Sequence, residues 1–466
     1  NQAVRDHYRR YYPLTAAAAG RLYLNPGAGY VGPNCHEPRV ALAVLHALLA
    51  PHIHAGRVHL RLRTRAVVET SGDVITVVHL RDAEGLEREV KAAYVLDATE
   101  LGDLLPMAGA EYVTGAESQA EYDEPHAPTV ADPLNMQAIT WCFALDHIEG
   151  ADFTIERPRD YDFWRVYQPP FWPNRLLDFT YPFPQDLRPL TTTIVPNPDD
   201  DPVAIDAIPA DRTGTEDLWL YRRILARRNF VSGAFESDIT LANWPQHDYW
   251  EGPIIEVRPE EVKRHLDGAR QLSLSLLYWL QTEAPRRDGG IGYPGLRLRP
   301  DVMGTDDGLA KAPYVRESRR IRAEQTVTEN DMSAEVRGEL GVRAYRDSVG
   351  VGMYRVDLHP STGGDGYIDL AAVPYELPLG ALVPVRMDNL IPACKNVGTT
   401  HLANACYRQH PTEWVIGEVA GVLAAECIDS GRRPREVRGD EARVERFQRR
   451  LTDRGVDIRW PDIRPY

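Results

Sequence analysis

Residues 389–427 constrain the fold more than any other stretch of the chain. A short apolar run at Leu390 predicts a buried strand, a glycine-bearing turn follows, and Pro411 then opens a helix. Gly417 and Gly421 leave one side of this helix nearly bare, at a cost of about 1 kcal/mol for each glycine. Such a helix can lie very close to a neighbouring backbone or a flat ligand, and its N-terminus favours an anion or a polarised carbonyl.

Four further blocks belong with this segment. They are NCHEPRVALAVLHALLA (34–50), YVLDATELGDLLPMAGAEYVTGAESQAE (94–121), RESRRIRAEQTVTENDM (316–332) and YELPLGALVP (375–384). Together the blocks resemble, in order, the FAD-dependent oxidoreductases related to the fumarate reductase and thiazole-synthesis flavoproteins. The resemblance runs from about residue 30 to residue 430. In that family the matching helix points its N-terminus at the pyrimidine side of the isoalloxazine.

The resemblance implies an α/β fold (α+β overall) with two domains, a Rossmann-like FAD domain and an inserted substrate domain. We expect residues 1–124 to form the first part of the FAD domain and residues 125–335 the substrate domain. Residues 336–430 then complete the FAD domain, and residues 431–466 form a C-terminal helix and tail. Within the first part, helix 39–52 and strands 58–69, 74–80 and 90–97 are expected, with a hairpin turn at 71–73.

A strand, a glycine-rich turn and a helix make up the dinucleotide-binding unit that the family carries at its N-terminus. We recognise no such unit at the start of this sequence. Gly27, Gly29 and Gly32 spell G-x-G-x-x-G, but Pro26 precedes them and no acid lies about 20 residues further on. We therefore predict a loop here and expect the natural protein to be longer. Whether the unit is absent from the given sequence, processed off or supplied by another chain is left open.

The resemblance also implies a set of residues that contact FAD, drawn from both ends of the FAD domain. The set is Glu37, Arg39, Arg65, Ala66, Ala98, Thr99, Asn396, His401, Gln409, His410, Pro411 and Thr412. Where the family usually continues the D-A-T pattern with glycine, this chain has Glu100.

Hydride removal from an alcohol or amine carbon is assisted by a base, most often histidine. We predict His359 and His410 as candidate bases and interpret His401 mainly as support for its turn; a structural histidine is the alternative in each case. Arg408 is expected to balance a reduced flavin or to hold a substrate carboxylate, with a plain salt bridge as its alternative. The charged run 316–320 is interpreted as a solvated or ion-paired face that anchors the substrate domain.

These residues predict an FAD-dependent oxidoreductase that transfers a hydride from a small alcohol, amine or sugar-like substrate to flavin N5. Oxygen, a quinone or another carrier would reoxidise the flavin. One alternative is a flavin monooxygenase that uses NAD(P)H and oxygen. Another is a non-catalytic scaffold relative that lost its dinucleotide site.

Charge and composition exclude several other classes. The net charge of −15 disfavours nucleic acid as a partner, and no apolar run approaches a membrane span. Five scattered cysteines without C-x-x-C indicate reduced thiols and a cytoplasmic protein rather than a disulfide framework. His52 and His54 have no third ligand nearby, so no metal is expected. A homo-oligomer is left open.

The middle of the chain differs in composition from the rest. Residues 169–209 carry a proline every few residues, which predicts ordered loops and edge strands. Helix 261–282 is expected to be the backbone of the substrate domain, and Trp164, Tyr167 and Trp172 either form a stacking wall for a substrate or are core residues. Residues 440–454 predict a charged amphipathic helix that braces the surface.

Overall fold

The computed structural model describes residues 1–198 and 217–460. Contacts between Cα atoms divide the chain into two compact units. Unit 1 holds Asn1–Leu60, Ile139–Tyr249 and Lys263–Tyr314, and unit 2 holds Arg61–Ala138, Trp250–Val262 and Val315–Tyr466. The first 60 residues therefore pack with the middle of the chain, whereas the sequence analysis had grouped them with residues 61–124. Which function each domain has stays a prediction.

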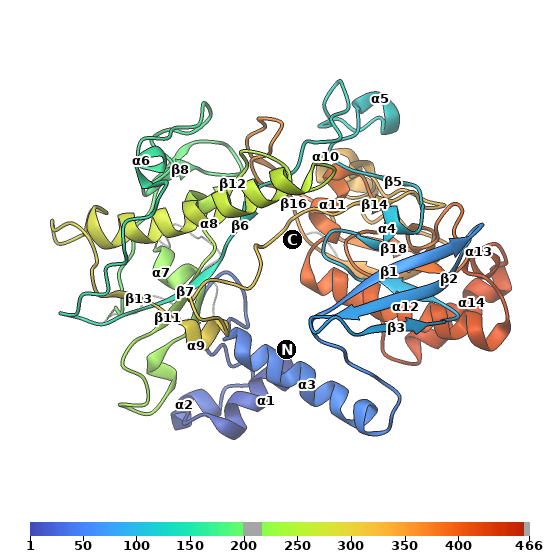
Figure 1. Cartoon of the computed structure of the whole chain (residues 1–466), viewed down its shortest axis with the longest axis horizontal. Coiled ribbons are helices and arrows are strands. Elements are labelled where there is room, and N and C mark those ends of the chain that lie inside the picture. Colours follow the sequence, from blue (N-terminus) through green and yellow to red (C-terminus); the bar gives the residue numbers. More distant parts are fainter. Residues whose placement is uncertain (199–216, 461–466) are drawn as a thin grey trace. The chain divides into compact units, whose positions relative to one another are not determined.

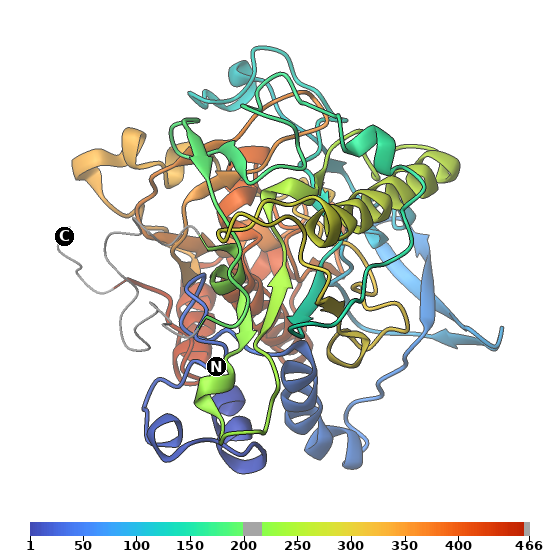
Figure 2. The same cartoon turned by 90° about the vertical axis from the view of Figure 1, so that its left-hand side faces the viewer.

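Unit 1 is built on an antiparallel sheet of four strands in the order β10-β11-β7-β13. Its elements are α1 (Gln2–Tyr11), α2 (Ala16–Ala19), α3 (Pro38–His54), β6 (Ile139–Thr140), β7 (Phe143–His147), α6 (Tyr161–Trp164), β8 (Thr180–Pro182), β9 (Pro189–Thr191), α7 (Leu218–Tyr221), β10 (Arg223–Leu225), β11 (Ile239–Ala242), β12 (Asp248–Tyr249), all but the first turn of α8 (Pro259–Thr282), β13 (Leu296–Leu298) and α9 (Pro300–Met303). Figures 1 and 2 show α1, α2 and α3 grouped together. One core of this unit joins Tyr8 of α1 and Val40 of α3 to Leu225 and Ile239 of the sheet.

The two predicted helices of unit 1 are present, but they differ in how many of their apolar residues are buried. Helix α3 buries Val40 alone, while Leu45 and Leu48 on the same helix are exposed. Helix α8 buries its apolar face, as predicted. Trp164 and Trp172 are buried, so these aromatic residues belong to the core and do not form an open stacking wall. Of the proline-rich stretch, residues 169–198 form loops and the short β8–β9 pair, and residues 199–209 lie outside the described residues.

The G-x-G-x-x-G run is a loop, as predicted, and close packing explains two of its glycines. A Cβ added to Gly27 would lie 2.1 Å from the carbonyl oxygen of Arg223, and one added to Gly29 would lie 2.7 Å from the same atom. The Arg223 guanidinium donates to the carbonyl oxygens of Gly27 and Ala28, and it forms a buried ion pair with Asp238. Gly27 and Gly29 therefore allow the loop to pack directly against β10.

Unit 2 contains several small sheets and the long C-terminal helices. Its elements are β1 (Thr64–Ser71), β2 (Val74–Asp82), β3 (Glu87–Val90), β4 (Val95–Asp97), α4 (Leu104–Met107), β5 (Tyr112–Val113), α5 (Gln119–Tyr122), β14 (Arg320–Ile321), α10 (Ala334–Arg337), β15 (Ser348–Gly352), β16 (Val356–Leu358), β17 (Ile368–Leu370), β18 (Tyr375–Pro378), β19 (Leu390–Pro392), α11 (His401–Tyr407), α12 (His410–Ser430), α13 (Pro434–Arg438) and α14 (Glu441–Thr452). Helix α12 packs against α14 and β15, and α14 buries Phe447 and Leu451 in the largest core of the unit. Helix α14 is thus a packed part of the unit.

The first strands of unit 2 agree only in part with the sequence analysis. The hairpin β1–β2 forms around Gly72, whose φ of 60° suits glycine. The strand expected over 58–69 starts only at Thr64. The strand expected over 90–97 is two strands in two sheets: β3 pairs with β2, and β4 forms a parallel pair with β19. Because β4 and β19 are parallel, the C-terminal end of β4 lies beside the turn that leads from β19 to α11.

The glycine packing in unit 1 makes a testable prediction. Gly27→Ala should lower the free energy of unfolding by about 2 to 3 kcal/mol, because the new methyl group meets backbone that cannot move aside. Gly32→Ala, in the same run, is the matched control: a Cβ there has nothing within 4 Å and should change stability by less than about 0.5 kcal/mol. Denaturant unfolding followed by tryptophan fluorescence measures both. Equal effects of the two changes would contradict the packing explanation.

Candidate functional site

Two of the predicted reactive residues meet within unit 2, at the β16–β17 hairpin. Strand β16 alternates, with Val356 and Leu358 in the core and Asp357 on the other face; His359 follows directly. Helix α11 packs against β16, and Arg408 follows that helix at its C-terminal end. The alternation of the strand and the end of the helix thus place Asp357, His359 and Arg408 together.

Asp357 is the centre of this cluster. Its carboxylate oxygen Oδ1 lies 3.9 Å from Nε2 of His359, and Oδ2 lies 3.7 Å from Nη2 of Arg408. The same Nη2 donates a hydrogen bond of 2.7 Å to the carbonyl oxygen of Asp357. Burial by itself would raise the pKa of Asp357, but the charges of His359, Arg408 and Arg316 outweigh it and hold this pKa below its usual value. Asp357 is therefore ionised at neutral pH.

The backbone of His359 is held by a second chain of contacts, which runs through the buried side chains of Gln137 and Glu317 to that of His401. Its N–H donates to Oε1 of Gln137 at 3.2 Å, and Nε2 of Gln137 donates to Oε1 of Glu317 at 3.0 Å. The same Glu317 oxygen lies 2.7 Å from Nδ1 of His401. Because a carboxylate only accepts, Glu317 dictates which way the Gln137 amide faces.

Glu317 and His401 form a charged pair. Burial lowers the pKa of His401, but Glu317 outweighs it and the pKa of the imidazole is raised. Burial raises the pKa of Glu317, yet His401 and Arg320 outweigh it and that pKa is lowered. The raised pKa of His401 and the lowered pKa of Glu317 both favour the charged forms, so the pair is ionic.

The ring of His359 makes an edge contact with the ring of Tyr367, with 5.5 Å between the ring centroids.

A layer of buried acids surrounds the start of α11. Glu117 pairs with Arg320 at 2.8 Å and accepts from the N–H of His401 at 2.9 Å. Glu124 accepts from the hydroxyl of Thr400 and from the N–H of Glu329, both at 2.6 Å. Burial raises the pKa of Glu124 to about 7, against the lowering effect of these hydrogen bonds.

The structure corrects the interpretation of the charged run 316–320. Arg316, Glu317 and Arg320 are buried, at 2%, 2% and 0% exposure, so the run is no solvated face. The ion-paired part of that interpretation holds, through the pairs of Glu317 with His401 and of Arg320 with Glu117.

The predicted flavin contacts at the start of α12 occupy a helix end that its N-cap residue does not cap. Gln409 is that residue and its side chain makes no capping hydrogen bond; the helix begins at His410, one residue before the predicted opening at Pro411. His410 and Pro411 are exposed. Thr412 is buried, with its hydroxyl 3.1 Å from that of Tyr375. The first-turn amides of this long helix are therefore not used by the side chain of Gln409, and unused first-turn amides are what a site for a carbonyl requires.

The predicted contacts at β4 are partly engaged within the protein. The hydroxyl of Thr99 donates to Asp97 at 2.7 Å, and the amide of buried Asn396 donates to the carbonyl oxygen of Asp97 at 3.0 Å. Ala98 is exposed. Glu100 forms an ion pair of 2.5 Å with Lys395. Asn396 thus ties the turn after β19 to the end of β4.

The remaining predicted contacts lie elsewhere. Arg65 of β1 is exposed and Ala66 is half-buried against the core beside α4. Glu37 and Arg39 belong to unit 1, where Arg39 is 2.5 Å from the fully buried carboxylate of Glu37 and Tyr8 donates to that carboxylate. These two residues form an internal ion pair; a cofactor contact by any of the twelve residues stays a prediction.

Asp357 and Gln137 were missed. A signal for Asp357 was present, since V-D-L-H places one acid at the polar position of a strand and a histidine two residues on. Gln137 gave none, because its contact joins residues 222 apart in sequence.

The described residues lack a metal cluster, a membrane-spanning helix and a disulfide bond. No group of three or more His, Cys, Asp or Glu residues is arranged to hold a metal ion. No helix in the described ranges combines the length and the apolar character that a membrane crossing requires. The five cysteines form no disulfide.

Comparison with protein families gives one match. The family described as FAD dependent oxidoreductase matches residues 2–451. Comparisons with curated proteins and with solved structures found no match.

The raised pKa of Glu124 predicts a pH-dependent stability. In the folded protein the carboxyl group of Glu124 keeps its proton up to about pH 7, whereas in the unfolded chain it loses the proton near pH 4.5. The free energy of unfolding therefore falls progressively as the pH rises between those values. Glu124→Gln removes this loss and should raise the free energy of unfolding above pH 7 by about 3 kcal/mol relative to the natural chain, with little difference at pH 4. Unfolding curves across this range measure the difference.

Glu121→Gln, on the exposed neighbouring helix α5, is the matched control for Glu124→Gln and should show no such pH dependence. A difference between Glu124→Gln and the natural chain that stays constant with pH would contradict the buried proton.

Proposed function

Because the chain belongs to the FAD dependent oxidoreductase family, we propose that it oxidises a small organic substrate, an alcohol, an amine or a sugar-like compound. The protein is an enzyme that uses FAD, which excludes the scaffold alternative. FAD, when bound, accepts the hydride that leaves the substrate carbon. The final electron acceptor is proposed to be oxygen, a quinone or another carrier.

The described residues fit the ring end of FAD at the start of α12. Gln409, Pro411 and Thr412 lie at the positive end of a helix of 21 residues, whose first-turn amides the side chain of Gln409 does not cap. These groups would hold a ring carbonyl and stabilise negative charge on it. The run of Gly27, Gly29 and Gly32 does not supply a phosphate cradle, since it packs against Arg223. The residues of α12 therefore carry the proposed cofactor contact.

His359 is proposed as the base that takes the proton from the substrate heteroatom. The observation that carries this role is the cluster of His359, Asp357 and Arg408. An ionised Asp357 beside the imidazole stabilises the imidazolium that forms when His359 takes a proton. It also favours the ring orientation in which Nε2 faces Asp357.

Arg408 and Gln137 are proposed to position this base. Arg408 is buried and binds both the carbonyl and the carboxylate of Asp357, so it holds the acid in place and keeps it ionised. Gln137 fixes the main chain of His359 from the other side. Together they restrict both the ring and the backbone of the base, which is what a short proton transfer requires.

His359→Asn tests the proposal. The rate of anaerobic flavin reduction by an alcohol, amine or sugar substrate should fall by about 10²- to 10⁴-fold, because the proton of the heteroatom then has no acceptor. Bound flavin, measured by its visible absorbance, should be unchanged. His79→Asn is the control and should retain the natural rate, since this half-buried histidine of β2 pairs with Glu69 and belongs to none of the proposed contacts.

The same experiment distinguishes the competing reaction. Flavin that is reduced by NADPH but by no organic substrate, with oxygen then incorporated into a product, would support the monooxygenase instead. An unchanged rate of reduction in His359→Asn would show that this histidine is not the base.

A further inference from the structure

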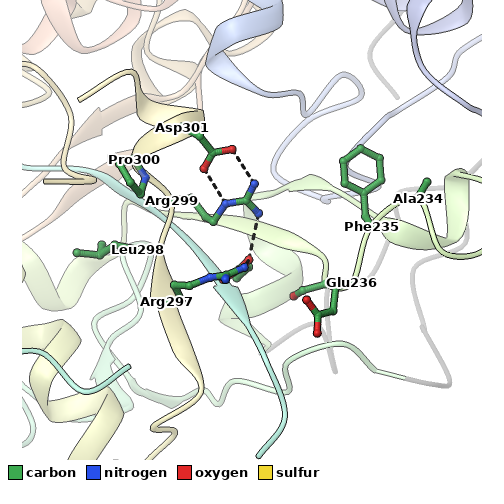
Figure 3. Close-up of a pocket in the computed structure, with 10 residues that line it drawn as sticks. Ala234, Phe235, Glu236, Arg297, Leu298, Arg299, Pro300 and Asp301 are labelled. Atoms are coloured by element: carbon green, nitrogen blue, oxygen red, sulfur yellow. Dashed lines mark hydrogen bonds and ion pairs between the residues drawn. The ribbon is translucent and has the colours of Figure 1, made fainter. Parts of the chain in front are cut away.

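Unit 1 contains a cavity that no predicted site residue lines. Its volume is about 470 Å³, within the range of small-molecule sites. The wall consists of Asp146 from β7, residues 234–237 before β11, and residues 297–301 from β13 to α9. Figure 3 shows the charged side chains and the ring of Phe235 arranged around it. Strands β7 and β13 of one sheet supply part of the wall, and the adjoining loops and the start of α9 supply the rest.

One side of the cavity is a row of ion pairs. Asp146 is buried and accepts two hydrogen bonds from Arg297, at 3.0 and 2.6 Å, and one from Arg299 at 3.0 Å. Arg299 in turn donates two hydrogen bonds of 2.8 Å to Asp301. Asp301 also lies 3.4 Å from Arg39. These charges neutralise one another, so the row offers fixed polar groups with little net attraction for an ion.

Two groups on the wall keep unused hydrogen-bonding capacity. Among the described residues, Nη1 of Arg297 donates no hydrogen bond, although its other two nitrogens bind Asp146. Glu236 is exposed, and its carboxylate has no hydrogen-bond or ion-pair partner among residues 1–198 and 217–460. One donor and one acceptor therefore remain on the wall of the cavity that Phe235 also lines.

We propose that this cavity binds a neutral polyhydroxylated ligand, a sugar ring or a related polyol. A hydroxyl group both donates and accepts, so vicinal hydroxyls satisfy Glu236 and Arg297 together. The half-buried ring of Phe235 offers an apolar face on which the C–H face of a sugar ring can lie. An anion would meet the carboxylate of Glu236 and a cation would meet the guanidinium of Arg297, which leaves a neutral ligand as the best match.

Saturation-transfer NMR on the full chain tests the proposal. The probes are D-glucose, D-mannose and myo-inositol at millimolar concentration, beside glucose 6-phosphate and the zwitterion glycine. At least one neutral probe should receive saturation, and a titration should give its dissociation constant. The measurement needs no turnover. A sugar-like substrate at the redox site would also receive saturation, so variants of the cavity wall are needed to assign the signal to this cavity.

Two variants locate the binding. Glu236→Gln and Phe235→Leu should each weaken the binding of the neutral probe about tenfold, through loss of a charge-assisted hydrogen bond and of the ring face respectively. Glu156→Gln and Phe163→Leu change exposed residues of the same unit outside the cavity and should leave the dissociation constant unchanged. Far-ultraviolet circular dichroism checks that all four variants are folded.

Three results would overturn the proposal. The first is the absence of saturation transfer to every neutral probe with the natural chain. The second is equal binding by Glu236→Gln, Phe235→Leu and their controls. The third is preferential binding of glycine or of the sugar phosphate, which would assign the cavity to a charged ligand.

Discussion

The buried ion pair of Glu317 and His401 supports the arrangement of the candidate site in unit 2. An isolated charge at either position would be strongly disfavoured, since both side chains are almost inaccessible to water. Paired, they hold the start of α11 next to residue 317, and Glu317 fixes the amide of Gln137. Gln137 then holds the backbone of His359. A charge pair that is costly to break thus determines the position of a histidine that it does not touch.

The same principle organises unit 1. Arg223 is buried, pairs with Asp238 and donates to the loop around Gly27, so the loop must lie directly on the strand. Glycine is required there because any Cβ would meet the Arg223 carbonyl. A run of letters typical of a nucleotide site therefore has a packing role. Its context in the sequence, a preceding proline and no following acid, indicated this correctly.

Much of the candidate site could be predicted from local patterns. Pro411 and the small residues after it indicated α12, and His359 was identified from its place in the C-terminal part of the chain. The partners of His359 could not be predicted in the same way. Gln137 is 222 residues from His359 in sequence, and Arg408 comes near β16 only when α11 packs against that strand. Asp357 is two residues from His359 and was overlooked although the local pattern carried a signal. The charged run at 316–320 was misjudged because its partners, Glu117 and His401, come from distant segments.

By itself the sequence indicated the class of protein, because its blocks, in their order, resemble those of FAD-dependent oxidoreductases. Its periodicity and turn residues indicated mixed helices and strands, since such local signals act over a few residues. Tertiary structure alone decided which charges are buried, which of them pair, and that residues 1–60 pack with the middle of the chain. Burial and pairing depend on segments that meet only in the folded chain. The free energy of ionising a side chain depends on those neighbours as well as on the type of residue.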